Sequence, residues 1–263
     1  MDSDRERFEF AVQIAREAGQ LTLRYFGQIG LVSEQKADAT PVTEADREAE
    51  LLLRERIGQA FPEDEILGEE FPTKLGTSAY RWIIDPIDGT KSFVRGVPLY
   101  GTMIGVEREG QLEIGVVHIP ATGECVFAAR GMGAWYEDRT GNRRRAKVST
   151  VDDLSQALVL TTDIAHFCQI GRPEVWDRLA GRVKMTRTWG DCYGYLLVAT
   201  GRAEVMIDPI VNVWDAAALV PILEEAGGCL TDWQGQRRID SGSILATNPA
   251  LLPAVLAITR LGP

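Results

Sequence analysis

The chain of 263 residues has few cysteines and few histidines. Its four cysteines are scattered and form no Cys-x-x-Cys pair. Thiols in this arrangement are most often reduced core residues of a cytosolic protein, so we expect a cytoplasmic location and no disulfides. The two histidines, His118 and His166, lie outside every motif described below, and we expect them to be structural.

The chain also lacks an excess of positive charge and any long apolar run. Its 28 lysines and arginines against 38 acids give a net charge of −10. This charge would repel a nucleic-acid backbone, and a phosphorylated substrate would bind well only if metal ions first reversed the local field. No run approaches the ~18 apolar residues that span a bilayer. The charged first seven residues are unlike a signal peptide. We therefore expect neither a nucleic-acid nor a membrane partner.

With 45% hydrophobic residues, the chain is long enough to bury a sizeable core as one large or two small domains. Helical spacing of apolar residues predicts a first helix ending near Gly27 and a second around residues 46–57. Short strands with close turns between residues 100 and 137 predict an antiparallel meander. After Val151, strands alternate with helices. We expect an N-terminal half, 1–150, and a C-terminal half, 151–263.

Three local expectations concern prolines and arginines. The strand that begins at Tyr80 should end at Asp85, because Pro86 has no N–H for the ladder. A helix over residues 214–226 should be kinked by Pro221. The arginines at 143–145 are expected in an exposed loop.

The most informative stretch is residues 82–90, which reads Trp-Ile-Ile-Asp-Pro-Ile-Asp-Gly-Thr. A buried strand would hold Asp85, and the following turn would aim Asp88 towards it. Paired carboxylates beside a backbone carbonyl are the hard oxygen ligands that Mg²⁺ prefers. A capped turn with Asp88 as an ordinary N-cap explains the same residues equally well.

Other acids also lie at ends of predicted strands or starts of predicted helices, where open α/β sheets present their sites. Glu69 ends a short strand, and only a cation would justify burying one of the acids at 69 and 70. Asp46 follows Thr43 in a near capping box, and capping is its stronger explanation by base rate. Asp215 begins a helix, where the macrodipole favours an acid.

Taken together, the blocks at 68–70 (Gly-Glu-Glu), 82–90, 214–218 (Trp-Asp-Ala-Ala-Ala) and 224–228 (Glu-Glu-Ala-Gly-Gly) closely resemble the inositol monophosphatase superfamily. These are Mg²⁺-dependent, lithium-sensitive phosphatases, and the blocks occur in the family's order over nearly the whole chain. The resemblance implies a layered αβαβα sandwich, as in the inositol monophosphatase and fructose-1,6-bisphosphatase superfamily. It also implies a homodimer.

The resemblance implies roles for individual residues. Glu69, Asp85 and the carbonyl of Ile87 would hold one Mg²⁺, and Asp85 would bridge to a second ion. Asp88 and Asp215 would complete that second site, with two or three ions in all. Thr90 and Asp46, together with Glu69, would orient and deprotonate the attacking water. The amides of Gly89 and Thr90 would donate to the phosphate.

The segment 187–195 is similar to that of histidinol-phosphate phosphatases of histidine biosynthesis. There Arg187, Gly190 and Asp191 would join Asp88, Asp215 and the 89–90 turn in binding the substrate. Asp191 and the short acid Asp208 would pair with the cationic end of histidinol phosphate. A helix N-cap is the rival explanation for Asp191, and pairing with an acid is the rival for Arg187.

These features predict Mg²⁺-dependent hydrolysis of a phosphate monoester, with L-histidinol phosphate as the expected substrate. An inositol-1-phosphate or broader sugar-phosphate phosphatase is the alternative within the same class. A catalytically silent, metal-binding scaffold is the alternative from another class, but it should have lost Thr90, Asp46 or a ligand, and all are present.

Overall fold

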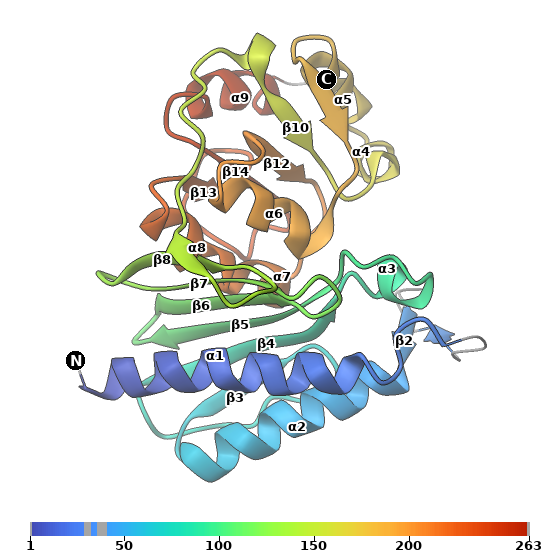
Figure 1. The fold of residues 1–263 in the computed structure, drawn as a ribbon. Coiled ribbons are helices and arrows are strands. Elements are labelled where there is room, and N and C mark those ends of the chain that lie inside the picture. The colour runs from blue at the N-terminus through green and yellow to red at the C-terminus, as the bar shows by residue number, and fades with distance from the viewer. Residues whose placement is uncertain (1, 29–32, 36–40, 262–263) are drawn as a thin grey trace.

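The computed structural model describes residues 2–28, 33–35 and 41–261. Within them, two β-sheets alternate with three layers of helices (Figure 1). The α/β layered sandwich that the sequence predicts is therefore confirmed. A separate two-stranded ribbon joins β1 (Ser33–Gln35) to β2 (Pro41–Thr43).

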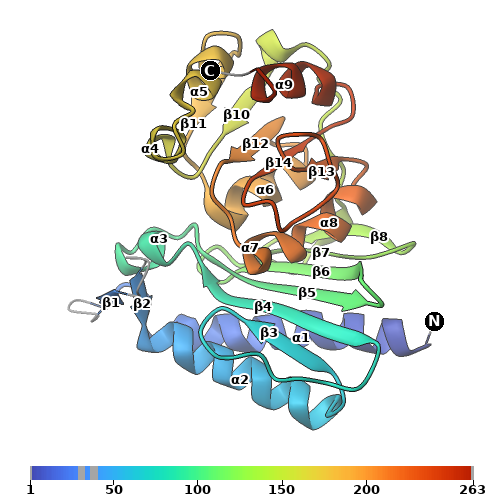
Figure 2. The ribbon, with the colours of Figure 1, turned by 180° about the vertical axis from the view of Figure 1, so that it is seen from behind.

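The first sheet has seven strands in chain order, β3 to β9. Only β3 and β4 run parallel, and all other neighbours are antiparallel, so the predicted meander is confirmed. Helices α1 (Asp2–Thr22) and α2 (Glu44–Ala60) cover one face and bury an apolar cluster against it (Figure 2). The strands are β3 (Glu65–Gly68), β4 (Tyr80–Asp88), β5 (Gly101–Arg108), β6 (Gln111–Ile119), β7 (Glu124–Ala129), β8 (Gly133–Glu137) and β9 (Arg143–Arg145).

The second sheet has the order β11-β10-β12-β14-β13 and mixes parallel with antiparallel pairs. Helices α5 (Pro173–Ala180) and α9 (Leu252–Thr259) pack on its outer face around Phe167 of α4 (Ile164–Gln169). The strands are β10 (Leu158–Leu160), β11 (Met185–Arg187), β12 (Val205–Asp208), β13 (Cys229–Thr231) and β14 (Ile244–Thr247).

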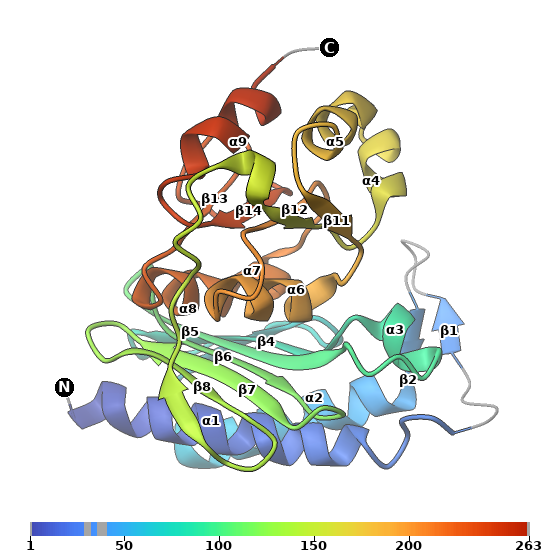
Figure 3. The ribbon, with the colours of Figure 1, turned by 45° about the horizontal axis from the view of Figure 1, so that its top comes forward.

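The middle layer joins the two sheets. Helices α6 (Asp191–Ala199), α7 (Val213–Ala217) and α8 (Leu219–Glu225) lie between them (Figure 3). One buried cluster takes side chains from both sheets and from these helices, for example Val117, Leu219 and Met206. The sheets fall on either side of the predicted boundary at residue 150, but independent folding of the two halves stays a prediction.

The structure corrects the expectation about Pro86 and confirms that the helix containing Pro221 is not continuous. Strand β4 does not end at Pro86 but continues to Asp88 through a change of register. The predicted helix over 214–226 is divided at Ala218 into α7 and α8. Pro221 consequently lies in the first turn of α8, where a helix has no internal partner for the backbone N–H.

Two other boundaries differ from the sequence prediction. The arginines at 143–145 form β9, an exposed edge strand paired with β8, rather than a loop. Charged side chains at an edge discourage pairing with another chain. Helix α1 ends at Thr22, and turns carry the chain on to Gly27. Within the described residues, no helix combines the length and the apolarity needed to cross a membrane.

Gly115 on β6 allows the closest approach of the middle layer to the first sheet. A Cβ at this position would lie 2.0 Å from the carbonyl oxygen of Ala218, between α7 and α8. We expect Gly115→Ala to lower the free energy of unfolding by about 1–3 kcal/mol, because a backbone contact cannot yield easily. Urea unfolding followed by circular dichroism measures the change.

The matched control is Gly58→Ala on α2, where a Cβ would meet nothing within 4 Å. This variant should be more stable than the parent by roughly 0.5–1 kcal/mol, because alanine favours a helix. Equal stability of the two variants would contradict a close contact between Gly115 and the carbonyl oxygen of Ala218.

Candidate active site

A β-bulge in β4 brings Asp85 and Asp88 to the same face of the sheet. Asp85 pairs with Met103 and Asp88 pairs with Gly101, so three residue steps on β4 oppose two on β5. In an unbroken strand, residues three apart point to opposite faces. The one extra residue cancels this alternation. Pro86 is tolerated in the bulge, and its carbonyl accepts a hydrogen bond of 2.9 Å from Thr102 Oγ1.

Asp215 reaches the same place from α7. The backbone N–H of Asn212 donates to Asp215 Oδ2 at 2.7 Å, completing a capping box at the start of that helix. One carboxylate oxygen each from Asp85, Asp88 and Asp215 lies within 4.8 Å of the others. The structure therefore brings together three of the predicted ligands, although binding of a metal by them stays a prediction.

The charge of Glu69 contributes to raising the pKa of both Asp85 and Asp215. This effect indicates that Glu69 lies near this group. The turn that carries it is held by Glu50 of α2, which is fully buried. Glu50 accepts hydrogen bonds from the N–H groups of Glu70 (2.7 Å) and Phe71 (3.2 Å), and from Arg54 Nε (2.7 Å). Glu50 therefore determines the path of the chain directly after Glu69.

The acidic cluster is electrostatically costly without a cation. Burial, followed by the charges of Glu69, Asp88 and Asp215, raises the pKa of Asp85 well above its usual range. Burial also raises the pKa of Asp88, and it raises that of Asp215 to about 7. Oxygen donors that repel one another in this way suit a hard divalent cation such as Mg²⁺, which supplies the missing positive charge. The residues present therefore fit the metal.

Thr90 and Asp46 form a pair next to the cluster. Thr90 Oγ1 lies 3.2 Å from Asp46 Oδ1 and 3.0 Å from the carbonyl oxygen of Ile87. Asp46 also accepts from the backbone N–H of Thr43 (2.8 Å), as the near capping box predicted. Burial is the largest cause that raises the pKa of Asp46, to about 6. Asp46 therefore caps α2 with one oxygen and faces Thr90 with the other.

Residues of the second half border the cluster. The backbone N–H of Cys192 donates to Asp88, so the start of α6 contacts the acidic group directly. Gly190, rather than Asp191, is the N-cap of α6, and Asp191 is its first residue, with φ +51°. The Asp191 carboxylate lies over Gly89, where an added Cβ would be 2.9 Å from Oδ2. Burial, followed by the charge of Asp208, raises the pKa of Asp191 to about 7.

The structure does not support the predicted contact of Asp208 with substrate. Asp208 is only 3% exposed, and its carboxylate accepts four hydrogen bonds from protein donors. Arg187 is exposed at the end of β11, with its guanidinium 5.9 Å from the centre of the Trp189 ring. His118 packs against Gly19, and burial lowers its pKa to about 4, consistent with a structural role.

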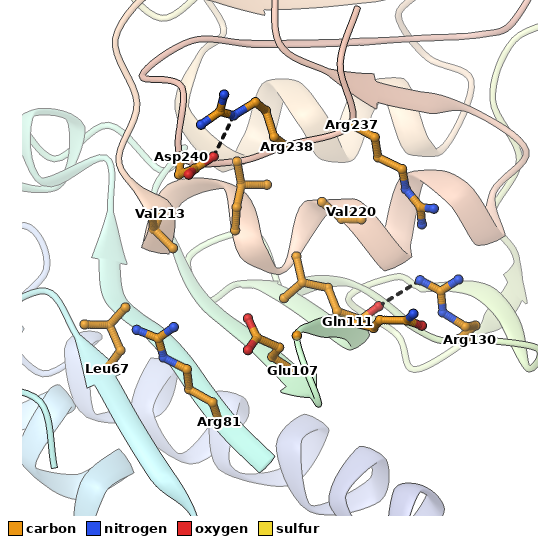
Figure 4. Close-up of a pocket in the computed structure, with 13 residues that line it drawn as sticks. Leu67, Arg81, Glu107, Gln111, Arg130, Val213, Val220, Arg237, Arg238 and Asp240 are labelled. Carbon is orange, nitrogen blue, oxygen red and sulfur yellow. Dashed lines mark hydrogen bonds and ion pairs between the residues drawn. The ribbon is translucent and has the colours of Figure 1, made fainter. Parts of the chain in front are cut away.

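A cavity of about 620 Å³ between the two halves does not include the acidic cluster (Figure 4). Four arginines line it, and each has an acid within ion-pair distance. Their charges are therefore balanced within the protein. The pairs are Arg81 with Glu65, Arg130 with Glu113 and Glu224, Arg237 with Glu224, and Arg238 with Asp240.

Three residues that support the site were missed in the sequence. Glu50 lies four residues after Asp46 on the buried face of α2, and an acid in that apolar stripe was an available signal. Asn212, three residues before Asp215, completes a recognisable capping pattern. Thr162 donates to Asp208 and accepts from Asp191, which no local pattern reveals.

Comparison with known proteins places the chain among phosphatases. The sequence model of the inositol monophosphatase family matches residues 3–261. A histidinol-phosphatase of Chlorobaculum parvum is 45% identical over 92% of both chains, and one of Mycobacterium tuberculosis is 39% identical over 95% of this chain and 96% of the other. The crystal structure of the extragenic suppressor protein suhB of Bartonella henselae superposes with a TM-score of 0.89, at 28% identity, over 97% of this chain and 98% of that one.

The raised pKa values predict how stability depends on pH. An aspartate raised from 3.8 to about 7 in the folded state contributes its stability fully below about pH 4 and loses it as the pH rises through 7. We expect the melting temperature of the metal-free protein to fall between pH 5 and pH 8. Mg²⁺ at 100 times its dissociation constant should raise it again at pH 8, by roughly 5–10 °C.

Differential scanning calorimetry with and without MgCl₂, at matched ionic strength, measures both effects. In Asp215→Asn, which removes one of the repelling charges, the fall with pH and the rise with Mg²⁺ should both be smaller. A melting temperature of the metal-free protein that is equal at the two pH values, or one at pH 8 that Mg²⁺ leaves unchanged, would contradict the electrostatic account.

Glu50→Gln tests whether Glu50 positions Glu69. A neutral amide cannot accept from both backbone N–H groups and Arg54 as the carboxylate does. Affinity for Mg²⁺, measured by titration calorimetry, should fall roughly 10–100-fold. The control is Glu55→Gln on the same helix, where Glu55 is exposed and binds only Gln59 among the described residues. Equal affinities in the two variants would exclude the positioning role.

Proposed function

The chain belongs to the inositol monophosphatase family, and on that premise we propose that it hydrolyses L-histidinol phosphate to L-histidinol and phosphate, with Mg²⁺ as cofactor. The enzymes of this family are phosphomonoesterases, so the open question is the alcohol that leaves. The two histidinol-phosphatases above support histidinol, which carries a cationic amine.

The position of Asp191 carries this proposal. Its carboxylate lies at the border of the acidic cluster, over Gly89 and 3.5 Å from Ser92 Oγ. Its charge is among those that raise the pKa of Asp88 and Asp215. Among the described residues, no ion pair involves Asp191. Burial and the charge of Asp208 raise its pKa to about 7, although the charge of nearby Lys91 acts in the opposite direction. A substrate ammonium group would supply the charge that Asp191 lacks.

Glu69, Asp85, the carbonyl of Ile87, Asp88 and Asp215 would hold two or three Mg²⁺ ions. Bound there, Mg²⁺ would neutralise the phosphate and make water more acidic. Thr90 would accept the proton of the attacking water while its own hydroxyl proton moves to Asp46, 3.2 Å away. Because the pKa of Asp46 is about 6, this carboxyl is largely ionised at neutral pH and able to take that proton.

The remaining parts of the substrate would meet the turn at 89–90 and the segment 187–191. The amides of Gly89 and Thr90 would donate to the phosphate, and Gly190 would join Asp191 in binding the alcohol. Arg187, which is exposed at the end of β11, would reach the substrate or its phosphate. In the reaction, the water oxygen forms a bond to phosphorus while the bond between phosphorus and the ester oxygen breaks. The leaving oxygen would take a proton from a second water molecule to form the alcohol, and the proton held by Asp46 would neutralise the hydroxide that remains.

A homodimer in the cytoplasm is the assembly and location that we propose with this function. The support is the resemblance in sequence and four cysteines that are all free thiols. Sedimentation equilibrium of the purified protein measures the assembly.

The substrate is tested by phosphate release from histidinol phosphate, inositol 1-phosphate and fructose 1,6-bisphosphate, with Mg²⁺ and with EDTA. We expect the highest kcat/KM for histidinol phosphate and no release with EDTA. Asp191→Asn should raise KM for histidinol phosphate by roughly 10–100-fold, because a charge-assisted hydrogen bond is lost. The same change should affect inositol 1-phosphate much less, since inositol has no cation.

Comparable kcat/KM for inositol 1-phosphate would favour the inositol-phosphatase alternative. Release that is absent with every substrate would leave the silent scaffold as the better explanation, whereas release that is indifferent to EDTA would contradict the role of Mg²⁺.

A further inference from the structure

Asp208, at the end of β12, has no capacity left to bind a substrate. Its Oδ1 accepts from Thr161 Oγ1 (3.1 Å) and the N–H of Thr162 (2.8 Å). Its Oδ2 accepts from Thr162 Oγ1 (3.0 Å) and Tyr195 Oη (2.8 Å). A carboxylate has about four acceptor positions, and all four are used. With 3% of its surface exposed, Asp208 must act through its neighbours.

Thr162 connects Asp208 to Asp191. Its hydroxyl donates to Asp208 Oδ2 and accepts from the backbone N–H of Asp191 at 2.9 Å. The contact is tight, because a Cβ on Gly190 would lie 2.2 Å from the Cα of Thr162. The hydroxyl group of Thr162 thus attaches the segment at 190–191 to the loop that follows β10 in the second sheet.

Asp191 needs such an attachment because its backbone is strained. Its φ of +51° lies in the left-handed region, which residues other than glycine seldom adopt. Conformations of this kind persist only where the surroundings hold them, and they gather at functional sites. With this backbone conformation, the carboxylate lies over Gly89, where an added Cβ would be 2.9 Å from Oδ2.

We propose that Asp208 and Thr162 are positioning residues that hold Asp191 where it receives the cationic group of the substrate. Asp208 orients the Thr162 hydroxyl by accepting its hydrogen bond, so that an oxygen lone pair faces the N–H of Asp191. Of these three residues, only Asp191 contacts the substrate. This inference rests on the proposed function, which gives Asp191 its role in binding the leaving alcohol.

The rival explanation is that the network only stabilises the start of α6. The two threonines separate these explanations, because both donate a side-chain hydrogen bond to Asp208 but only Thr162 also bonds to Asp191. Thr162→Val removes the link to Asp191 at nearly constant volume. Thr161→Val removes one bond to Asp208 and leaves that link intact. Thr162→Ser keeps the hydroxyl and should restore the parent behaviour.

The experiment measures kcat and KM of the Mg²⁺-loaded enzyme with histidinol phosphate and inositol 1-phosphate. We expect Thr162→Val to raise KM for histidinol phosphate roughly three- to tenfold, with a smaller change in kcat. Its preference for histidinol phosphate over inositol 1-phosphate, as the ratio of kcat/KM values, should fall by a similar factor. Thr161→Val should keep the ratio of the parent. Equal losses in both valine variants, or failure of serine to rescue, would overturn the positioning role.

Crystal structures of the two valine variants test the same relation without any substrate. The inference predicts that the Asp191 carboxylate leaves its place over Gly89 in Thr162→Val and keeps it in Thr161→Val. An unmoved Asp191 in both would overturn it. If Asp191→Asn leaves the kinetics of histidinol phosphate unchanged, the proposed function fails. The structures of the valine variants then decide the link between Thr162 and Asp191 independently.

Discussion

One extra residue in β4 is the constraint on which the site depends. A regular strand would send Asp85 and Asp88 to opposite faces of the sheet, one of them into the apolar layer beneath α1 and α2. The bulge turns both towards the middle layer, where α7 brings Asp215. The remaining features, from the capped helix ends to the approach of α6, serve to hold charged groups around this point.

The protein accommodates the repulsion of its acids by giving several of them two tasks. Asp46 caps α2 and faces Thr90, while Asp215 caps α7 and faces Asp85. A hydrogen bond from the backbone stabilises each carboxylate in its ionised form and also restricts its direction. Structural and catalytic explanations of these acids are therefore not rivals, since one capping bond serves both purposes.

The two halves contribute different chemistry. The first sheet supplies the bulge and Glu69, whereas the second half supplies Asp215 and the segment around Asp191. The N–H of Cys192 on Asp88 joins them directly.

Local sequence determined the alternation of sheets and helices, the meander, and the acids at strand and helix ends, because apolar periodicity and capping patterns act over a few residues. It misjudged Pro86, since whether a proline ends a strand depends on whether its N–H is needed there. Only the tertiary structure decided that Asp208 is saturated and that Thr162 links it to Asp191. These bonds join residues 29 to 47 positions apart, so their geometry depends on how β10, β12 and α6 pack.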